Sequence, residues 1–215
     1  MESRFPDDTI LSKDLQGYLW DTFLTTIDIG LEKIRNGSLK EPVKTDNLQL
    51  VKSVCNFLDN FLRLESGFKG DDKQKRKDLD AIFAWSYAWG LGASLDDWSK
   101  SYFDNLVKDC FKTANFPTSF TVFDYFYDMK KDHAFKPWDG SVPKFEYNRD
   151  ASYFDLMVPT ADTFKHRYCL ETLLAVKKNV FFTGLTGVGK TATIVNTLTA
   201  MSLNDLTPIY LNFSA

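Results

Sequence analysis

The eight residues from Gly184 to Thr191 read GLTGVGKT and match the pattern G-x-x-x-x-G-K-[ST] of a phosphate-binding loop. A phosphate chain needs backbone N–H groups turned inward around it. Three glycines of the loop permit this tight path because they have no Cβ atom to clash: Gly184, Gly187 and Gly189. The Lys190 ammonium can then approach the β and γ phosphates, and the Thr191 hydroxyl is a hard oxygen ligand for Mg²⁺. The pattern therefore predicts the binding of a nucleoside triphosphate with Mg²⁺.

The predicted nucleotide-binding loop comprises eight consecutive residues: Gly184, Leu185, Thr186, Gly187, Val188, Gly189, Lys190 and Thr191. At average residue frequencies this pattern arises by chance in roughly one sequence in a hundred of this length. The alternative interpretation is a glycine-rich turn followed by a surface lysine. The flanking residues favour the nucleotide-binding loop, because that motif requires a strand before it and a helix after it.

The residues on either side of the loop have the patterns of a strand and a helix. Val180–Thr183 is a short apolar run that predicts a strand, and residues 190–201 contain few helix breakers, which predicts a helix. A second strand is predicted at Pro208–Phe213. Strand, loop, helix and strand over 34 residues have the size of one βαβ unit. We therefore expect the first βαβ unit of a P-loop NTPase α/β domain in this part of the chain.

Hydrolysis of a nucleotide needs groups that lie outside the loop. An acidic residue at the end of another strand must position Mg²⁺, a second group must orient the attacking water, and an arginine should face the developing charge. Only 24 residues follow Thr191. We assign no catalytic residue, and we expect the chain as given to bind nucleotide weakly at best.

The chain before the loop is predicted to be mostly helical, which makes the fold class mixed. Apolar residues recur at helical spacing in three stretches: Leu15–Asn36, residues 48–67 and residues 79–112. In the third stretch, Gly90 and Gly92 interrupt the pattern and predict either a bend or a close helix contact.

Two regions outside these helical stretches have a different amino-acid composition. The run GDDKQKRKD at residues 70–78 holds charges of both signs and predicts a solvated loop or the start of a helix. Residues 115–159 combine four of the seven prolines with many aromatics, which excludes long helices. Short strands are predicted at 120–128 and 144–147, so this region is expected to be a structured connector.

Composition excludes several classes of function. With 26 basic and 29 acidic residues the net charge is −3, so we expect no nucleic-acid partner. The most apolar stretch, residues 81–93, is 13 residues long, whereas a membrane span needs about 20. The acidic, polar start predicts no secretory signal and a cytoplasmic protein. Three widely spaced cysteines predict buried, reduced thiols rather than disulfides or a metal site: Cys55, Cys110 and Cys169.

Several stretches, taken in order, carry a family pattern. LQLVKSVCNFLD at 48–59 is similar to a segment NLVKSLCNLLD, and FAWSYAWGLGAS at 83–94 is similar to F-x-x-S-x-x-W-x-x-G-A-S. Four shorter stretches follow: VPKFEY at 142–147, VPTADT at 158–163, TGLTGVGKT at 183–191 and LNFSA at 211–215. Together, from about residue 18 to residue 215, they resemble the motor region of dynein heavy chains, and the axonemal type more than the cytoplasmic type.

The resemblance implies a division of the chain into three parts. Residues 1–112 would form the helical lid of the second AAA+ module, and residues 113–159 the connector with short strands. Residues 160–215 would be the N-terminal part of the third AAA+ module. The same resemblance implies that Val158, Pro159 and Thr160 border the adenine, although Pro159 and Thr160 are equally compatible with a simple helix start.

The resemblance also implies a function that belongs to a larger protein. Dynein heavy chains couple ATP hydrolysis to movement along microtubules in cilia and flagella. The cofactors would be ATP and Mg²⁺, and the location the cytoskeleton of the axoneme. The partners would be neighbouring AAA+ modules, microtubules and dynein intermediate and light chains. Because the third module is a regulatory nucleotide site in this family, Lys190 would tune the motor rather than power it.

Two other functions remain open from the residues. The first is a small nucleotide-binding switch of the GTPase type, which the loop alone supports, although no room follows for a guanine-specifying N-K-x-D. The second is a non-catalytic interaction module, in which the helices of residues 15–112 pack on a partner and the loop is idle. Nucleotide titration would separate these possibilities.

Overall fold

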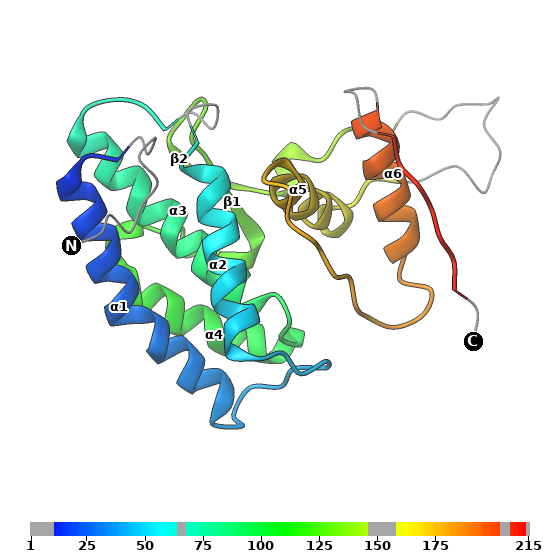
Figure 1. Cartoon of the computed structure of the whole chain (residues 1–215), viewed down its shortest axis with the longest axis horizontal. Helices are drawn as coiled ribbons and strands as arrows, with labels where there is room; N and C mark the ends of the chain where they lie inside the picture. Colours follow the sequence, from blue (N-terminus) through cyan, green and yellow to red (C-terminus); the bar gives the residue numbers. More distant parts are fainter. Residues whose placement is uncertain (1–10, 64–67, 146–157, 203–206, 214–215) are drawn as a thin grey trace. The chain divides into compact units, whose positions relative to one another are not determined.

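The structure is a computed structural model that describes residues 11–63, 68–145, 158–202 and 207–213 (Figure 1). The chain divides into two compact units, Met1–Pro137 and Trp138–Ala215. Each unit is described by itself below.

Four long helices form most of the first unit: α1 Lys13–Arg35, α2 Asn47–Phe61, α3 Asp72–Gly92 and α4 Asp97–Cys110. The side chain of the residue before each helix accepts a hydrogen bond from a backbone N–H in the first turn; these residues are Ser12, Asp46, Asp71 and Asp96. Such caps satisfy N–H groups that have no partner within the helix. The local sequence therefore sets where each helix begins.

The limits of the helices refine the sequence predictions. The helix predicted at 48–67 ends at Phe61 in the described residues, while residues 64–67 lie outside them. The charge run at 70–78 proves to be the start of α3. The block predicted at 79–112 is two helices, because α3 ends at Gly92 and α4 begins at Asp97.

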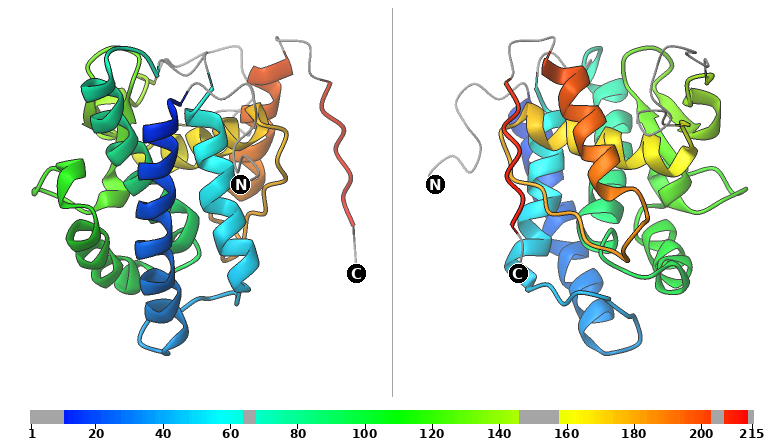
Figure 2. Two further views of the ribbon diagram at one scale, coloured as in Figure 1. Left: turned by 60° about the vertical axis from the view of Figure 1, so that its left-hand side comes forward. Right: turned by 90° about the vertical axis from the view of Figure 1, so that its right-hand side faces the viewer.

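Helix α3 is the centre of the first unit, since it contacts α1, α2 and α4 (Figures 1 and 2). From Leu79 onward its residues are buried with the exception of Asp80, so the helix is apolar on nearly all sides. The Trp85 ring lies edge-on to two aromatic rings of α2, with centroids 5.2 and 5.4 Å away: those of Phe57 and Phe61. A helix that is apolar all round requires this burial on several sides.

Two glycines allow the helices around α3 to approach closely. A Cβ atom on Gly90 would lie 2.6 Å from the backbone nitrogen of Val54 in α2. A Cβ atom on Gly30 of α1 would overlap the Tyr87 side chain, whose hydroxyl donates a 2.9 Å hydrogen bond to the Thr26 carbonyl. The close helix contact predicted for Gly90 is therefore confirmed, whereas α3 continues through Gly90 without interruption.

A small antiparallel hairpin follows the helices, formed by β1 Tyr125–Asp128 and β2 Ala134–Pro137. Short 3-10 turns precede it at Lys112–Ala114 and Val122–Asp124. The strand predicted at 120–128 is thus shorter than expected. The strand predicted at 144–147 is wrong for Lys144 and Phe145, which have no strand pairing, and residues 146–147 lie outside the described part. Strand β2 was not predicted, because its AFKP sequence lacks the β-branched residues that favour a strand prediction.

A buried carboxylate joins α3 to the hairpin. Asp78 is fully buried and accepts hydrogen bonds from the Gln74 amide at 2.8 Å and the Tyr127 hydroxyl at 2.7 Å. The Nδ1 atom of His133 lies 2.9 Å from the other carboxylate oxygen. Burial, with Asp78 nearby, raises the pKa of the Tyr127 phenol, which keeps it a donor. The charge run 70–78 is therefore not wholly solvated, since its last residue is a core polar group.

The second unit contains a 3-10 turn at Asp139–Ser141 and two α-helices, α5 Ala161–Ala175 and α6 Lys190–Ser202. These helices pack against each other. The strands predicted at Val180–Thr183 and Pro208–Phe213 are wrong in this structure, because neither segment has strand pairing in the described residues. A strand needs a hydrogen-bonded neighbour, and two strands with open edges are marginal in water. Exposed apolar side chains mark both segments, with Phe181 at 82% and Phe213 at 93%.

The three cysteines differ in exposure, which corrects the expectation that all are buried. Cys55 is exposed, Cys110 is partly exposed and only Cys169 is buried. All three are free thiols in the structure. Burial raises the pKa of the Cys169 thiol well above its ordinary value, so it should be unreactive. Its role is therefore packing.

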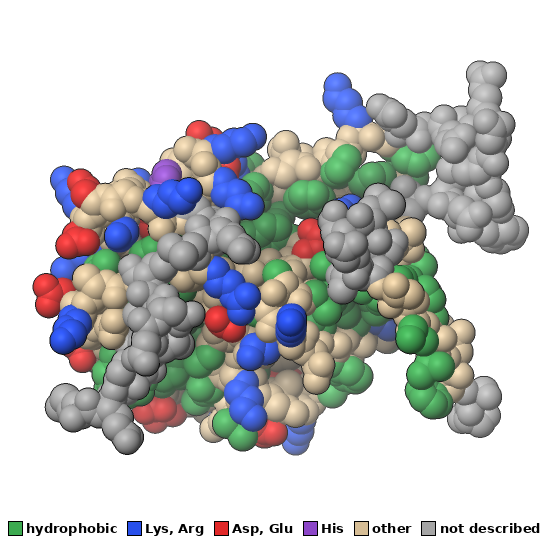
Figure 3. Space-filling view, turned by 45° about the horizontal axis from the view of Figure 1, so that its top comes forward, with side chains coloured by type: hydrophobic (Ala, Val, Ile, Leu, Met, Phe, Trp, Pro, Cys, Tyr) green, Lys and Arg blue, Asp and Glu red, His purple; other side chains and the backbone are tan. Residues whose placement is uncertain are grey.

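The described surface carries both signs of charge. On the face drawn in Figure 3, Lys and Arg side chains are interspersed with Asp and Glu side chains. Among the described residues, the helices are all too short or too polar to span a bilayer.

Candidate functional site

The loop predicted to bind nucleotide connects an extended segment to the N-terminus of α6. Its three glycines all have positive φ angles: Gly184 at 151°, Gly187 at 82° and Gly189 at 80°. Residues with a Cβ atom rarely adopt these conformations, so the sequence pattern and the backbone path agree. A Cβ atom on Gly187 or Gly189 would meet nothing within 4 Å, so there is space for a larger side chain at both positions. Backbone conformation, rather than crowding within the chain, requires these glycines.

Lys190 is the first residue of α6. Its ammonium donates hydrogen bonds to two loop carbonyls, those of Gly184 at 2.9 Å and Leu185 at 2.5 Å. The lysine side chain therefore folds back over the loop that precedes it. Phosphate oxygens would offer this cation stronger, charge-assisted hydrogen bonds than neutral carbonyls do.

The first turns of α6 hold the loop in place through backbone and hydroxyl groups. The Thr193 N–H and the Thr193 hydroxyl both bond to the Gly189 carbonyl, at 2.9 and 3.0 Å. The Thr197 hydroxyl continues the series by donating to the Thr193 carbonyl at 2.7 Å. The motif does not include Thr193, so the sequence analysis did not identify it as a residue that supports the loop. Its position four residues after Gly189, on a predicted helix, would have indicated this hydrogen bond.

Thr191 is exposed, so its hydroxyl is open to a ligand. The other loop residues from Gly184 to Gly189 are exposed as well, and Lys190 is partly exposed. The N-terminus of a helix attracts phosphate because its N–H groups and dipole point outward. The glycine loop is thus followed directly by the start of α6, with the Lys190 ammonium and the Thr191 hydroxyl in its first two residues. This arrangement fits a bound Mg²⁺ and phosphate chain.

A metal ion in such a site takes most of its ligands from phosphate and water. Among the described residues, no group of three or more His, Cys, Asp or Glu side chains could hold a metal by itself. Binding of Mg²⁺ by Thr191 stays a prediction from the motif.

The segment expected to border an adenine lies before α5. Thr160 is the N-cap of α5, since its hydroxyl accepts from the Thr163 N–H at 3.2 Å and its own N–H donates to the Thr163 hydroxyl at 2.9 Å. The helix-start interpretation of Pro159 and Thr160 is therefore confirmed. Val158 is 57% exposed and available to an apolar ring, and its contact with adenine stays a prediction.

Aromatic side chains of the second unit gather around α5. Trp138 lies edge-on to two rings of α5, with centroids 6.0 Å from Phe164 and 5.2 Å from Tyr168. The Phe182 ring, in the segment leading to the loop, is 6.3 Å from the His166 ring. Aromatic contacts therefore fix the segment before the loop beside α5.

A loop with the phosphate-binding sequence pattern at the start of a helix, following a helical unit, is typical of a P-loop NTPase region joined to a helical lid. Comparison with known families gives the same two parts. A family described as "Dynein heavy chain AAA lid domain" matches residues 19–140, and a family described as "P-loop containing dynein motor region" matches residues 145–215. The chain belongs to the dynein heavy chain family.

Individual relatives agree with this assignment. Dynein axonemal heavy chain 6 of Homo sapiens is 31% identical over 211 residues, which cover 95% of this chain and 5% of that protein. Dynein axonemal heavy chain 11 of Sus scrofa is 30% identical, covering 80% of this chain and 4% of the relative. The flagellar outer-arm dynein beta chain of Chlamydomonas reinhardtii is 26% identical, and the match covers 97% of this chain and 5% of that protein. The chain thus spans about one twentieth of the length of these relatives.

Proposed function

We propose that this chain contributes an ATP-binding Walker A loop, residues 184–191, at a regulatory AAA+ site of a dynein heavy chain. The observation that supports this most strongly is the loop itself. Three glycines with positive φ angles lead into α6, and Lys190 opens that helix with its ammonium turned back over the loop. Val158, Pro159 and Thr160 would border the adenine.

The proposed function extends to the arrangement of modules. Residues 1–112 would be the helical lid of the second AAA+ module and 113–159 a connector, while 160–215 would begin the third module. The second and third AAA+ modules would then be neighbours within one longer chain. Family membership supports this order, because the lid match precedes the P-loop match.

The activity of the whole protein follows from the family as a proposal. An ATP-dependent microtubule motor in the axoneme of cilia or flagella is supported by the printed names of the relatives, which include axonemal and flagellar dyneins. Its partners would be neighbouring AAA+ modules, microtubules, and dynein intermediate and light chains. Hydrolysis would require groups of the complete motor, so binding is the property to test with this chain.

The role of Lys190 can be tested by titrating a fluorescent ATP analogue with Mg²⁺ into the wild-type chain and variants. Lys190→Ala should weaken binding by about 10-fold to 100-fold, since one charged hydrogen-bonding group contributes about 1.5–3 kcal/mol. Lys178→Ala removes a lysine of the same unit outside the loop and should change affinity less than about twofold. Equal affinity of wild type and Lys190→Ala would refute the assignment. Displacement of the analogue by GTP but not ATP would support the GTPase-type alternative.

The role of Thr191 has a separate signature. Thr191→Val keeps the shape of the side chain and removes the hydroxyl, so affinity should fall in the presence of Mg²⁺ and change little when EDTA removes the ion. The same loss with and without Mg²⁺ would show that the hydroxyl does not act through the metal.

A further inference from the structure

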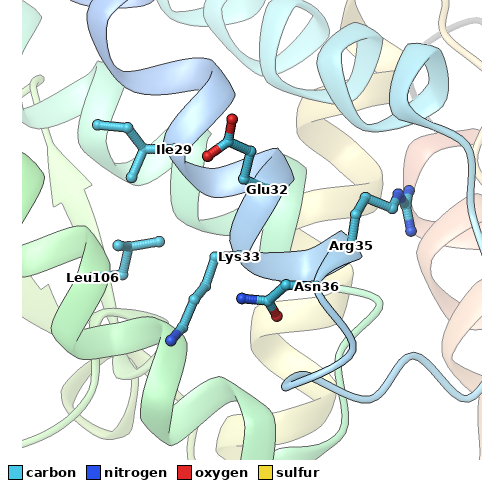
Figure 4. A pocket seen from close by; sticks show the side chains of 6 residues that line it. All are labelled: Ile29, Glu32, Lys33, Arg35, Asn36 and Leu106. Carbon is cyan, nitrogen blue, oxygen red and sulfur yellow. The ribbon is translucent and has the colours of Figure 1, made fainter.

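The groove between α1 and α4 combines an apolar floor with unpaired charges at its rim. Ile29 of α1 and Leu106 of α4 face the same open space, and Glu32, Lys33 and Asn36 surround it (Figure 4). Ile29 is 45% exposed, although an isoleucine is among the residues most often buried.

An aromatic ridge along α4 extends this apolar surface. Trp98, Tyr102 and Leu106 are spaced four residues apart, so they follow one side of the helix. The rings of Trp98 and Tyr102 lie 4.3 Å apart between centroids, and the two side chains are 61% and 51% exposed. Exposed Trp and Tyr side chains are enriched among the residues that carry most of the binding energy at protein interfaces.

The charge of α1 points to the chemistry of a partner. From Asp14 to Glu32 the helix contains four carboxylates and no lysine or arginine. All four are exposed and lie on the solvent side of the helix: Asp14, Asp21, Asp28 and Glu32. The acidic face adjoins Ile29 and the exposed Leu24, so apolar and negative groups alternate along it.

Three of the four basic side chains on α4 and in the last turn of α1 are engaged in ion pairs. Arg35 bonds the Glu41 carboxylate at 2.6 Å, and Lys108 bonds the Asp104 carboxylate at 2.9 Å. Lys100 faces Asp97 at 3.7 Å. Lys33 is the exception among the described rim residues, and its side chain extends toward α4 (Figure 4). The unpaired charges that line the groove are therefore Glu32 and Lys33, and every other charged residue of α1 between Asp14 and Glu32 is a carboxylate.

We propose that the groove lined by Ile29, Leu106 and Glu32 is a docking surface for a basic amphipathic helix. The surface would extend along α4 over Tyr102 and Trp98, and along α1 to Asp28, one turn before Glu32. Apolar side chains of the docking helix at i, i+3, i+4 and i+7 would cover the groove. Its lysines or arginines would face the α1 carboxylates. The complementary charges would provide specificity and speed of association, while the aromatic ridge would provide most of the affinity.

The probe for this proposal is a fluorescein-labelled, 18-residue amphipathic peptide with leucines on one face and lysines on the other. Binding to the whole chain is measured by fluorescence anisotropy at low salt. A comparison peptide has every lysine replaced by glutamate. The lysine peptide should bind at least tenfold more tightly than the glutamate peptide, and the preference should shrink as salt is raised.

Variants of the groove should alter this binding in opposite directions. Ile29→Ser should weaken both peptides at least fivefold, whereas Leu48→Ser on α2, at a position that is 62% exposed, should leave both unchanged. The double variant Asp28→Lys/Glu32→Lys should reverse the preference between the peptides. Lys33→Glu should strengthen binding of the lysine peptide several-fold.

A matched charge control separates local contacts from net charge. Asp59→Lys/Asp132→Lys makes the same change in net charge at α2 and the hairpin, outside the groove, and should keep the preference for the lysine peptide. Equal loss in this control and in the groove variant would overturn the proposal. So would an effect of Ile29→Ser on self-association in sedimentation without an effect on peptide binding, which would identify a second copy of the chain as the occupant.

Discussion

Replacing Gly90 by alanine should destabilise the helical unit, although alanine is the better helix former. A Cβ atom at this position would lie 2.6 Å from the Val54 nitrogen and 2.7 Å from the Val54 Cα atom. Favourable contacts between carbon atoms lie at about 3.5–4.0 Å, so α2 would have to move by about 1 Å. Because the obstructing atoms belong to a backbone, no side-chain rotation can relieve the overlap.

The magnitude follows from two opposing effects. Overpacking of a core costs about 1–3 kcal/mol, and the upper end applies where backbone must move. The better helix propensity of alanine offsets about 1 kcal/mol. Gly90→Ala should therefore lower the free energy of unfolding by about 2 kcal/mol. With a urea dependence of about 2 kcal/mol per molar, the unfolding midpoint should fall by about 1 M.

The matched control is Gly17→Ala in α1, because a Cβ atom there would meet nothing within 4 Å. This variant should gain about 0.5–1 kcal/mol from helix propensity alone. Tryptophan fluorescence is a suitable measurement for the first unit, which contains four of the five tryptophans. Equal or higher stability of Gly90→Ala, with Gly17→Ala behaving as expected, would refute the close approach of α2 and α3.

Two further changes test the first unit. The pKa of Asp96 is lowered by hydrogen bonds from the Ser99 N–H and hydroxyl, so its stabilising effect should be present above pH 3.8 and be lost as pH falls through the lower, folded-state pKa. Asp96→Ala should therefore lower the thermal unfolding midpoint at pH 7, and the difference in midpoint from wild type should narrow below pH 4. A difference that stays constant with pH would contradict a stabilising N-cap role for the Asp96 carboxylate. Trp85→Phe removes the 2.9 Å hydrogen bond to the Tyr125 carbonyl and leaves a small cavity, so far-UV circular dichroism during urea unfolding should show a loss of about 2–4 kcal/mol. Trp98→Phe, at an exposed site, should change stability by less than about 0.5 kcal/mol, and similar losses in both variants would contradict the distinct burial of the two rings.

Much of the helical fold could be predicted from the sequence, because helix signals are local. Helical spacing acts within a few residues, and it located α1, α2 and α6 well, while the helix start at Pro159 and Thr160 marked where α5 begins. The strands were predicted less well. Sheet pairing depends on residues far apart in the chain, which explains both the missed β2 and the unpaired segment at Val180–Thr183.

The candidate site was predictable for a similar reason. The positive φ angles of Gly184, Gly187 and Gly189 and the position of Lys190 at a helix start are properties of consecutive residues. The contribution of Val158 to an adenine site was not testable in this way, since it depends on how separate segments meet around a ligand.

Sequence alone determined the loop chemistry, the helix starts and membership of the dynein heavy chain family, because residue types at fixed spacings set each of these. Tertiary structure alone decided which similar residues became core and which became surface. Trp85 is fully buried beside α2, while Trp98 is exposed on α4. Asp78 ends a charged run, yet it is buried by Tyr127 and its neighbours. The physical reason is that burial depends on what packs against a side chain, and those partners come from distant parts of the chain.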